Sequence, residues 1–373
     1  MNNYYRNRQK EFAFMLQEEN LAAAIFEDSE NNRNSAIRYF TNHPGDAVLI
    51  ITNSAETILC PWDENIAKKR AIATKIIGLT KYNRNSIKAI KEILSELNIK
   101  KDSRIDIPPT TPYPIFLKYV EALFSYNVLC RENGIHQKVD KMRAIKDYEE
   151  IKSIRKAAEI TDELILKLEK GLKNDSIKTE TDVALMIEKE CRIAGCEGTG
   201  FESLVAGTKR SFGIHCFPSY TANSFGEEGL SLVDFGVIIN GYTSDVTVTI
   251  AKGNLSEKQE KQLNLVQKAY DEALKLYKPF LPIKTAAEKV DSIFSKGKTS
   301  MPHALGHGIG LEAHEFPVIK SNISDDIVFK PGMIVTLEPG LYNTTTGGCR
   351  LENDILITEF GNEVLTHSQI IRL

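Results

Sequence analysis

The sequence has few cysteines, little net charge and no long apolar run. Its six cysteines, among 373 residues, are scattered without a Cys-x-x-Cys pair, which argues against a disulfide framework and against a zinc ribbon. The net charge of −3 gives no support for a nucleic-acid partner or for a membrane-surface partner. No stretch approaches the roughly 18 apolar residues that a membrane span needs, and residues 1–6 lack the apolar region of a signal peptide. We therefore expect a globular protein of the reducing cytoplasm.

The chain is long enough for two domains. Before about residue 135, short apolar runs such as residues 47–51 alternate with helical periodicity such as that of residues 86–97, which is typical of an α/β domain. Apolar periodicity lapses and charge rises over residues 131–146. We predict a smaller α/β domain over residues 1–135 and a second domain over residues 142–373.

Helix signals open the second domain. Apolar residues at helical spacing predict a long helix over residues 151–168 that stops at Gly171. A second helix is expected to open with Thr179-x-x-Asp182. Capping boxes predict the starts of two later helices: Ser256 with Gln259, and Thr285 with Glu288.

An Asn240-Gly241 pair between two β-rich runs predicts a hairpin with a two-residue type I′ turn. The turn fixes the register, so that residue 234 faces residue 247. Asp234 and Asp245 then share one sheet face as diagonal neighbours, with Cα atoms roughly 7–8 Å apart. A solvated strand face is the alternative, but aspartate is disfavoured in strand interiors. Two carboxylates on one face repel each other, so the pair indicates a positive charge between them.

A glycine-rich run holds three of the seven histidines, His303, His307 and His314. Its alternating glycines disfavour a helix, and it lacks His-Glu-x-x-His, so it is not a helical zinc motif. The run predicts an imidazole kept exposed on a tightly packed strand or loop, with satisfied core histidines as the alternative. Further along, Glu338 and Glu352 each stand on a β-rich segment with alternating apolar residues.

These acidic residues and one histidine form a candidate ligand set. Oxygen-rich sites with one nitrogen suit Mn²⁺ or Co²⁺, and Zn²⁺ is also compatible. Two divalent ions would neutralise four carboxylates, whereas one ion would not, which favours a two-metal site that activates water. The set is Asp234, Asp245, His307, Glu338 and Glu352.

From about Met142 onward, the sequence resembles the creatinase/aminopeptidase P/prolidase metallopeptidase family. The motifs that carry this resemblance occur in the family's order: Leu232-Val233-Asp234-Phe235-Gly236, Thr243-Ser244-Asp245-Val246-Thr247, Gly306-His307-Gly308-Ile309-Gly310, His314-Glu315, Thr336-Leu337-Glu338-Pro339-Gly340 and Arg350-Leu351-Glu352-Asn353-Asp354. The N-terminal region is similar to the creatinase-type N-terminal domain through Arg38-Tyr39-Phe40-Thr41-Asn42. The resemblance implies an α/β (α+β) protein with a C-terminal pita-bread catalytic domain, a homodimer, and proline-containing peptides as substrates.

The same resemblance implies a role for each site residue. Asp245 and Glu352 would bridge two metal ions, Asp234 would bind one ion, and His307 and Glu338 would bind the other. An activated water would attack the carbonyl before proline, with Glu338 as proton acceptor.

Four further residues match the family's substrate and support positions. His215 would line the substrate site and assist proton transfer, and His314 would hydrogen-bond the scissile carbonyl or the developing oxyanion. His303 would be a further pocket histidine, for which a packed core histidine is the alternative, and Arg350 would orient an acidic ligand.

Departures from the family pattern bear on specificity. Some prolidases carry an arginine between the last histidine and the next strand, to hold a dipeptide's carboxylate, whereas residues 316–330 offer only Lys320 and Lys330. Asn353 stands where the family often has an acid. The creatinase branch lacks the metal ligands, and all five are present here.

We expect an Xaa-Pro aminopeptidase with two metal ions, Mn²⁺ foremost. An Xaa-Pro dipeptidase (prolidase) is the first alternative. A methionine aminopeptidase is disfavoured, because such enzymes usually lack the N-terminal domain. A catalytically silent binding module is disfavoured by the intact ligand set.

Overall fold

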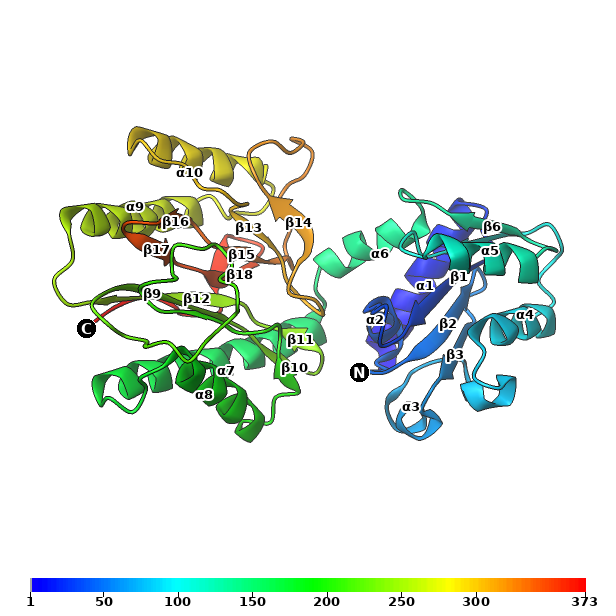
Figure 1. Ribbon diagram of the computed structural model, residues 1–373. Coiled ribbons are helices and arrows are strands. Elements are labelled where there is room, and N and C mark those ends of the chain that lie inside the picture. Colours follow the sequence, from blue (N-terminus) through cyan, green and yellow to red (C-terminus); the bar gives the residue numbers. More distant parts are fainter. Residues whose placement is uncertain (1) are drawn as a thin grey trace. The chain divides into compact units, whose positions relative to one another are not determined.

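The computed structural model describes residues 2–373. Two compact units make up the chain, Met1–Arg143 and Ala144–Leu373, and each has its own hydrophobic core (Figure 1). The expected domain limits, residues 135 and 142, both fall within helix α6 (Ile135–Ala144). Within the described residues, none of the helices combines the length and the apolarity that crossing a membrane requires.

A mixed six-stranded sheet runs through the first unit, with the strand order β4-β3-β2-β1-β5-β6. Strands β1, β2 and β3 are antiparallel neighbours, whereas β4, β5 and β6 pair in parallel. The strands are β1 (Ala23–Asp28), β2 (Ala47–Thr52), β3 (Thr57–Pro61), β4 (Lys75–Ile76), β5 (Arg104–Ile107) and β6 (Asn127–Cys130).

Helices cover both faces of this sheet. On one face, Phe26 of β1 packs on Phe12 and Phe40, with ring centroids between 5.0 and 5.6 Å apart. On the other face, Ile25 shares a core with Ile90. The helices are α1 (Asn2–Glu18), α2 (Ala36–Thr41), α3 (Glu64–Arg70), η1 (Leu79–Tyr82), α4 (Ser86–Glu96), α5 (Tyr113–Ala122) and α6.

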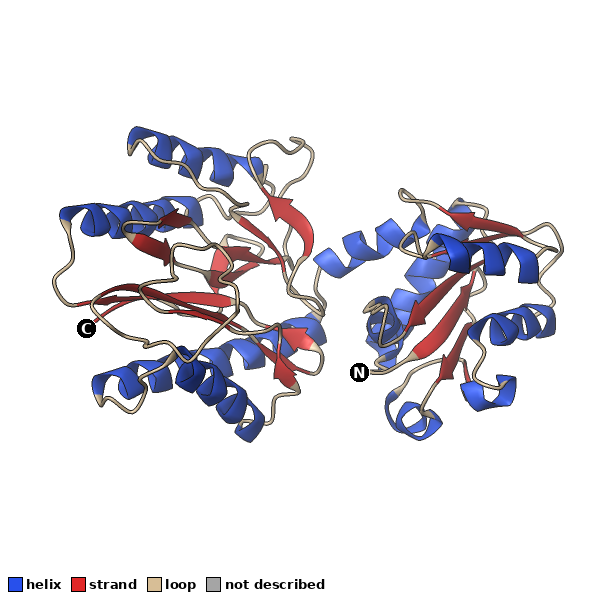
Figure 2. Cartoon of the chain, viewed as in Figure 1, coloured by secondary structure: helices blue, strands red, loops and turns tan. Residues whose placement is uncertain are grey.

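Four small sheets form the second unit (Figure 2). Their strand orders are β20-β12-β9-β8, β14-β13-β15-β18-β19, β11-β10-β7 and β16-β17. The strands are β7 (Gly198–Thr199), β8 (Leu204–Ala206), β9 (Gly229–Phe235), β10 (Val237–Ile239), β11 (Tyr242–Thr243), β12 (Val246–Lys252), β13 (Gly306–Gly308), β14 (Glu315–Ile319), β15 (Ile334–Leu337), β16 (Gly340–Asn343), β17 (Gly347–Arg350), β18 (Asn353–Ile357), β19 (Asn362–Val364) and β20 (Ile370–Arg372).

Two pairs of helices enclose these sheets (Figure 1). Helices α7 (Tyr148–Lys173) and α8 (Glu180–Ile193) share a core with the apolar side chains of β9 and β12. Helices α9 (Glu257–Leu274) and α10 (Lys284–Lys296) share a second core with β15 and β18. Helices therefore cover one face of the β9/β12 layer and one face of the β15/β18 layer. The two remaining faces meet in the interior of the unit.

Two of the predicted helix starts are confirmed, at Thr179 and Ser256, which both form complete capping boxes. The prediction at Thr285 is wrong: the N-cap of α10 is Ile283, two residues earlier, and its side chain makes no capping hydrogen bond. Gly171 does not end α7, which continues to Lys173. Glycine is needed there because a Cβ at this position would lie 2.5 Å from Cδ1 of Ile177, in the segment that folds back on the helix.

The hairpin register is confirmed. Ile239 pairs with Tyr242 and Asp234 with Thr247, so the register holds across the break at Gly236. Val246, Val248 and Ile250 pack toward α7 and α8. The opposite face is not solvated: Thr247 is fully buried and pairs with Glu352 in an isolated bridge. This face brings the aspartates of the hairpin beside the later glutamates.

Candidate metal centre

A cluster of acidic side chains and one histidine lies in the interior of the second unit. One donor atom each from Asp245, His307 and Glu352 falls within 4.8 Å of the others, and all three residues are buried. Nε2 of His307 lies 3.8 Å from Oδ2 of Asp245 and 3.5 Å from Oε1 of Glu338. The hairpin, the glycine-rich run and the β-rich segment of Glu352, all expected from the sequence to carry ligands, thus meet at one point.

The glycine-rich run explains how His307 reaches this point. A Cβ on Gly306 would lie 2.1 Å from the carbonyl oxygen of Thr336, and a Cβ on Gly308 would lie 2.3 Å from that of Phe316. Only glycine therefore lets β13 fit between β15 and β14. Strand β13 carries a register shift between His307 and Gly308. The run is a tightly packed strand, as expected, but the expected exposure of the imidazole is wrong: His307 is buried, because its ring points toward the interior acidic cluster.

Hydrogen bonds fix the orientation of the His307 ring. Nδ1 lies 3.1 Å from the carbonyl oxygen of Gly308, so it carries the proton and donates. Nε2 is left with its lone pair toward the carboxylates, which is the tautomer that binds a cation. Burial, and then the charge of His314, lower the pKa of His307 to about 4, so the ring is neutral at physiological pH.

Asp234 stands at the other side of the cluster and forms an ion pair with Arg350. Nε of Arg350 also donates to the hydroxyl of Thr247 at 2.7 Å, and that hydroxyl donates to Oε2 of Glu352 at 2.6 Å. Arg350 is buried among these groups. One guanidinium and one hydroxyl therefore hold two of the acidic residues in place.

The carboxylates hold more negative charge than one arginine balances. Burial, followed by the nearby Glu352, raises the pKa of both Asp245 and Glu338 well above the ordinary value. Burial and then Asp234 raise the pKa of Glu352 to about 7. Burial also raises the pKa of Asp234, although Arg350 opposes this effect. Without added positive charge, the site would take up protons.

The residues present fit divalent cations. Among the described residues, Oδ1 of Asp234 is buried without a hydrogen-bond partner, which is costly unless another group satisfies it. Oxygen donors with one neutral imidazole match the preferences of Mn²⁺ and Co²⁺. Cations bound here would take the place of protons, because carboxylate ligands must be deprotonated.

His303 lies beside Glu338, with Nδ1 3.6 Å from its Oε2. Nδ1 also lies 2.8 Å from the carbonyl oxygen of Ala304, and Nε2 lies 3.1 Å from the hydroxyl of Tyr342. That hydroxyl accepts from Nη1 of Arg350 at 2.7 Å. A hydrogen-bond chain therefore runs from the carbonyl of Ala304 through His303 and Tyr342 to Arg350, and Glu338 lies next to it.

The two remaining predicted histidines are exposed at the cluster. The ring of His314 packs against that of His307 at a tilt of 44°, with centroids 4.2 Å apart. Next to it, Glu315 forms a buried ion pair with Lys146, at 3.2 Å. Burial has the largest effect on the pKa of Asp234, which it raises, and then Arg350 and His215 each lower it. His215 also lowers the pKa of His314, after burial.

Sequence analysis gave no role to Tyr342 and Thr247, which complete the support around Arg350. Thr247 lies on the same strand face as Asp245, so its position could have indicated a supporting role. No sequence pattern indicates a role for Tyr342. Asp354 accepts a hydrogen bond from the backbone N–H of Asp245 at 3.0 Å. Asn353 bonds Tyr270 and Ser368 instead of the cluster, so the departure from the family pattern at this position does not alter the acidic set.

Comparison with known proteins identifies the family. The profile of metallopeptidase family M24 matches residues 152–359. An Xaa-Pro dipeptidase of Pyrococcus furiosus is 30% identical over 338 residues, which cover 89% of this chain and 91% of the relative. The crystal structure of X-Pro aminopeptidase from Thermotoga maritima superposes with a TM-score of 0.84 at 25% identity, covering 98% of this chain and 99% of that one.

A solved Xaa-Pro dipeptidase from Bacillus anthracis gives a TM-score of 0.83 at 27% identity, covering 99% of this chain and 100% of that one. These likenesses extend over both units, and they confirm the predicted α/β class and pita-bread architecture with a separate N-terminal domain. The family match confirms the resemblance on which the expectation of a hydrolase rested. The chain therefore belongs to metallopeptidase family M24 and is a metal-dependent peptidase.

Proposed function

We propose that this protein removes the residue that precedes proline at the N-terminus of peptides, as an Xaa-Pro aminopeptidase with two metal ions. The observation that carries the proposal is the buried meeting of Asp245, His307 and Glu352, with Asp234 and Glu338 beside them. Such a set gives a peptidase of this family its reactive centre. The names of the similar proteins, prolidases and X-Pro aminopeptidases, support proline as the second residue of the substrate.

In this proposal the metal ligands are the five residues of the acidic set, with Mn²⁺ as the first candidate and Co²⁺ or Zn²⁺ as alternatives. Bound there, two divalent ions would supply positive charge that polarises a carbonyl and lowers the pKa of a coordinated water. A homodimer is part of the proposal. The ligands are Asp234, Asp245, His307, Glu338 and Glu352.

The side chains around the ligands have separate tasks. Glu338 would accept a proton from the attacking water. His314, which is exposed and packs against His307, would donate to the scissile carbonyl oxygen. His215 would contact the peptide from the loop after β8. His303 would line the pocket beside Glu338, and Arg350 orients Asp234.

The choice between peptide lengths rests on the segment between His314 and Pro331. A dipeptide ends in a carboxylate directly after proline, and a bidentate arginine would hold it well. The segment 316–330 provides only Lys320 and Lys330, which are both exposed. Without an arginine clamp, the site can accept a longer chain, and contacts along that chain can add to transition-state binding.

The test is kcat/KM for matched Xaa-Pro and Xaa-Pro-Yaa peptides at one pH and one metal concentration. We expect the tripeptide to be cleaved at least as well as the dipeptide. The second candidate, an Xaa-Pro dipeptidase, is favoured by the named Pyrococcus relative, which matches about nine tenths of the chain. A preference for dipeptides of more than about tenfold, roughly 1.4 kcal/mol, would establish that second function in place of the first.

A further inference from the structure

A buried carboxylate outside the metal centre ties down the loop that carries His215. Glu180 is the first residue of α8, and its side chain is 0% exposed. It accepts hydrogen bonds from the backbone N–H groups of Gly207 and Thr221, both at 2.8 Å, and from the Thr221 hydroxyl at 2.7 Å. Gly207 directly follows β8, so one carboxylate holds both ends of the segment 207–221.

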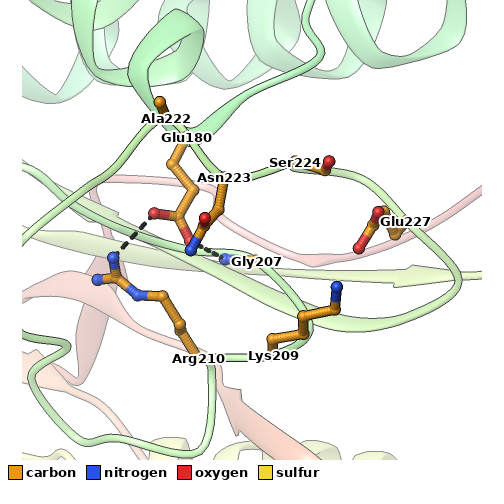
Figure 3. A pocket seen from close by; sticks show the side chains of 8 residues that line it. All are labelled: Glu180, Gly207, Lys209, Arg210, Ala222, Asn223, Ser224 and Glu227. Carbon is orange, nitrogen blue, oxygen red and sulfur yellow. Dashed lines mark hydrogen bonds and ion pairs between the residues drawn. The ribbon is translucent and has the colours of Figure 1, made fainter.

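An ion pair adds a third attachment. Nη1 of Arg210 donates to Glu180 at 3.0 Å, and Nη2 of Arg210 donates to the carbonyl oxygen of Pro218 on the return of the loop. Figure 3 shows Arg210 pointing at Glu180 from the opposite wall of a pocket. Polar side chains, including Asn223 and Lys209, line this pocket, so hydrogen bonds and charge, more than apolar packing, fix this side of the loop.

The far side of the loop touches the metal centre. The hydroxyl of Ser211 donates to the carbonyl oxygen of Leu230 on β9 at 2.7 Å and accepts from the N–H of Gly348 on β17 at 3.1 Å. Arg350 donates through Nη1 to the carbonyl oxygen of Ile214 at 3.0 Å. The residue next to His215 is therefore bonded to the arginine that holds Asp234. The imidazole itself is exposed, so its position depends on the backbone that carries it.

We propose that Glu180 is a positioning residue that acts through His215, by closing the base of the segment 207–221. This inference rests on the proposed function, in which His215 contacts the peptide. Replacing the carboxylate by an amide turns one oxygen acceptor into a donor that faces other donors. The loop would then move without loss of the metal ligands. A displacement of about 1 Å at a catalytic group can cost on the order of 10²-fold in rate.

The experiment is a double-mutant cycle of Glu180→Gln and His215→Ala, with metal content measured for each protein. With His215 present, Glu180→Gln is expected to lower kcat by about tenfold to a hundredfold while metal content stays at the wild-type level. With alanine at position 215, it is expected to lower kcat less than about twofold. Equal losses in both backgrounds would overturn the proposal.

Two further variants keep the test decisive. Thr221→Val removes the hydroxyl that donates to Glu180 and leaves the carboxylate in place. It replaces Glu180→Gln in the cycle if that variant folds poorly. It should give a smaller kcat loss, which also vanishes in the His215→Ala background. Glu150→Gln is the matched control, because Glu150 is likewise a buried glutamate in the first turn of a helix, α7. A kcat loss of the same size in this control would contradict a specific role.

Amide exchange separates this inference from the proposed function. In Glu180→Gln, amides of residues 207–221 should exchange faster than in Glu150→Gln, whatever the substrate is. If the wild-type protein cleaves no Xaa-Pro peptide, the proposed function fails. Faster exchange in Glu180→Gln would still support the role of Glu180 in holding the segment 207–221, which we call the Glu180 clamp. Unchanged exchange in this segment would overturn the clamp itself.

Discussion

Arg350 and Asp234 form a buried ion pair at the edge of the carboxylate cluster. The guanidinium uses its remaining donors on the Thr247 hydroxyl, the Tyr342 hydroxyl and the carbonyl oxygen of Ile214. A planar fork can serve four acceptors at once, whereas an ammonium group on a flexible chain cannot. Arg350 therefore aligns the acidic set and the His215 loop together.

We predict that Arg350→Lys lowers kcat/KM, or metal affinity, by about 10- to 100-fold, the usual cost of losing a group that orients a metal ligand. The measurement is steady-state kinetics together with metal titration. Arg372→Lys is the matched control, since Arg372 also makes two hydrogen bonds to a carboxylate, that of Glu260, but on an exposed surface. A similar loss in both variants would contradict the specific role of Arg350.

Chelation should abolish activity and lower the melting temperature of the second unit. Burial and the neighbouring carboxylates raise the pKa of Asp245, Glu338 and Glu352, so bound cations should stabilise the cluster. A metal ion at about 100 times its Kd raises the free energy of unfolding by roughly 2.7 kcal/mol. This corresponds to an increase in melting temperature of about 5–10 °C for a unit of this size. Calorimetry with and without chelator measures the shift, and Mn²⁺ or Co²⁺ should restore it. An unchanged melting temperature would exclude tight binding at this cluster.

Sequence predicted those parts of the site that depend on short-range rules. The Asn240-Gly241 turn fixed the pairing of Asp234 with Thr247, because a two-residue turn leaves one register. Alternation of side chains then placed Asp245 on the same face. The resemblance to a family supplied the later ligands, which the hairpin alone could not.

Long-range support could not be predicted in this way. Tyr342 reaches His303 and Arg350 through the pairing of β16 with β17, which no local pattern specifies. Gly171 looked like a helix stop because glycine commonly ends helices, but here a close approach by Ile177 requires it. The clamp at Glu180 joins three residues that are far apart in the sequence, and only the folded chain brings them together. They are Glu180, Gly207 and Thr221.

His307 and His314 should separate binding from catalysis. The His307→Ala variant removes the only imidazole of the acidic set, so it should lose metal and activity together. The His314→Ala variant should keep its metal and lose about 10²–10³ in kcat, the cost of one oxyanion donor. Metal analysis and kinetics on both proteins test the split, with the exposed His367→Ala as control. Equal metal loss in the two variants would show that the ligand is wrongly assigned.

The first unit contains a histidine that should make it sensitive to acid. His136 packs edge-on against Phe26, with centroids 4.6 Å apart, and its Nε2 lies 3.6 Å from Oδ1 of the buried Asp106, which is also paired with Arg131. Burial lowers the pKa of His136 to about 4, an effect that the backbone of Asp106 opposes and the charge of Arg131 increases.

Because the folded-state pKa lies below the ordinary value of 6.5, the unfolded chain binds a proton that the folded unit excludes. The contribution of His136 to stability is therefore complete above about pH 6.5 and is lost as the pH falls toward 4, by up to about 3 kcal/mol. We predict that His136→Gln, which cannot titrate, flattens this part of the stability profile.

Trp62, the single tryptophan of the chain, lies in the first unit, so urea unfolding followed by its fluorescence measures the unit directly. His367→Gln, an exposed histidine of the second unit, is the control and should leave the Trp62 transition unchanged. Parallel profiles for wild type and His136→Gln between pH 4 and 6.5 would show that another group governs the acid sensitivity of the first unit.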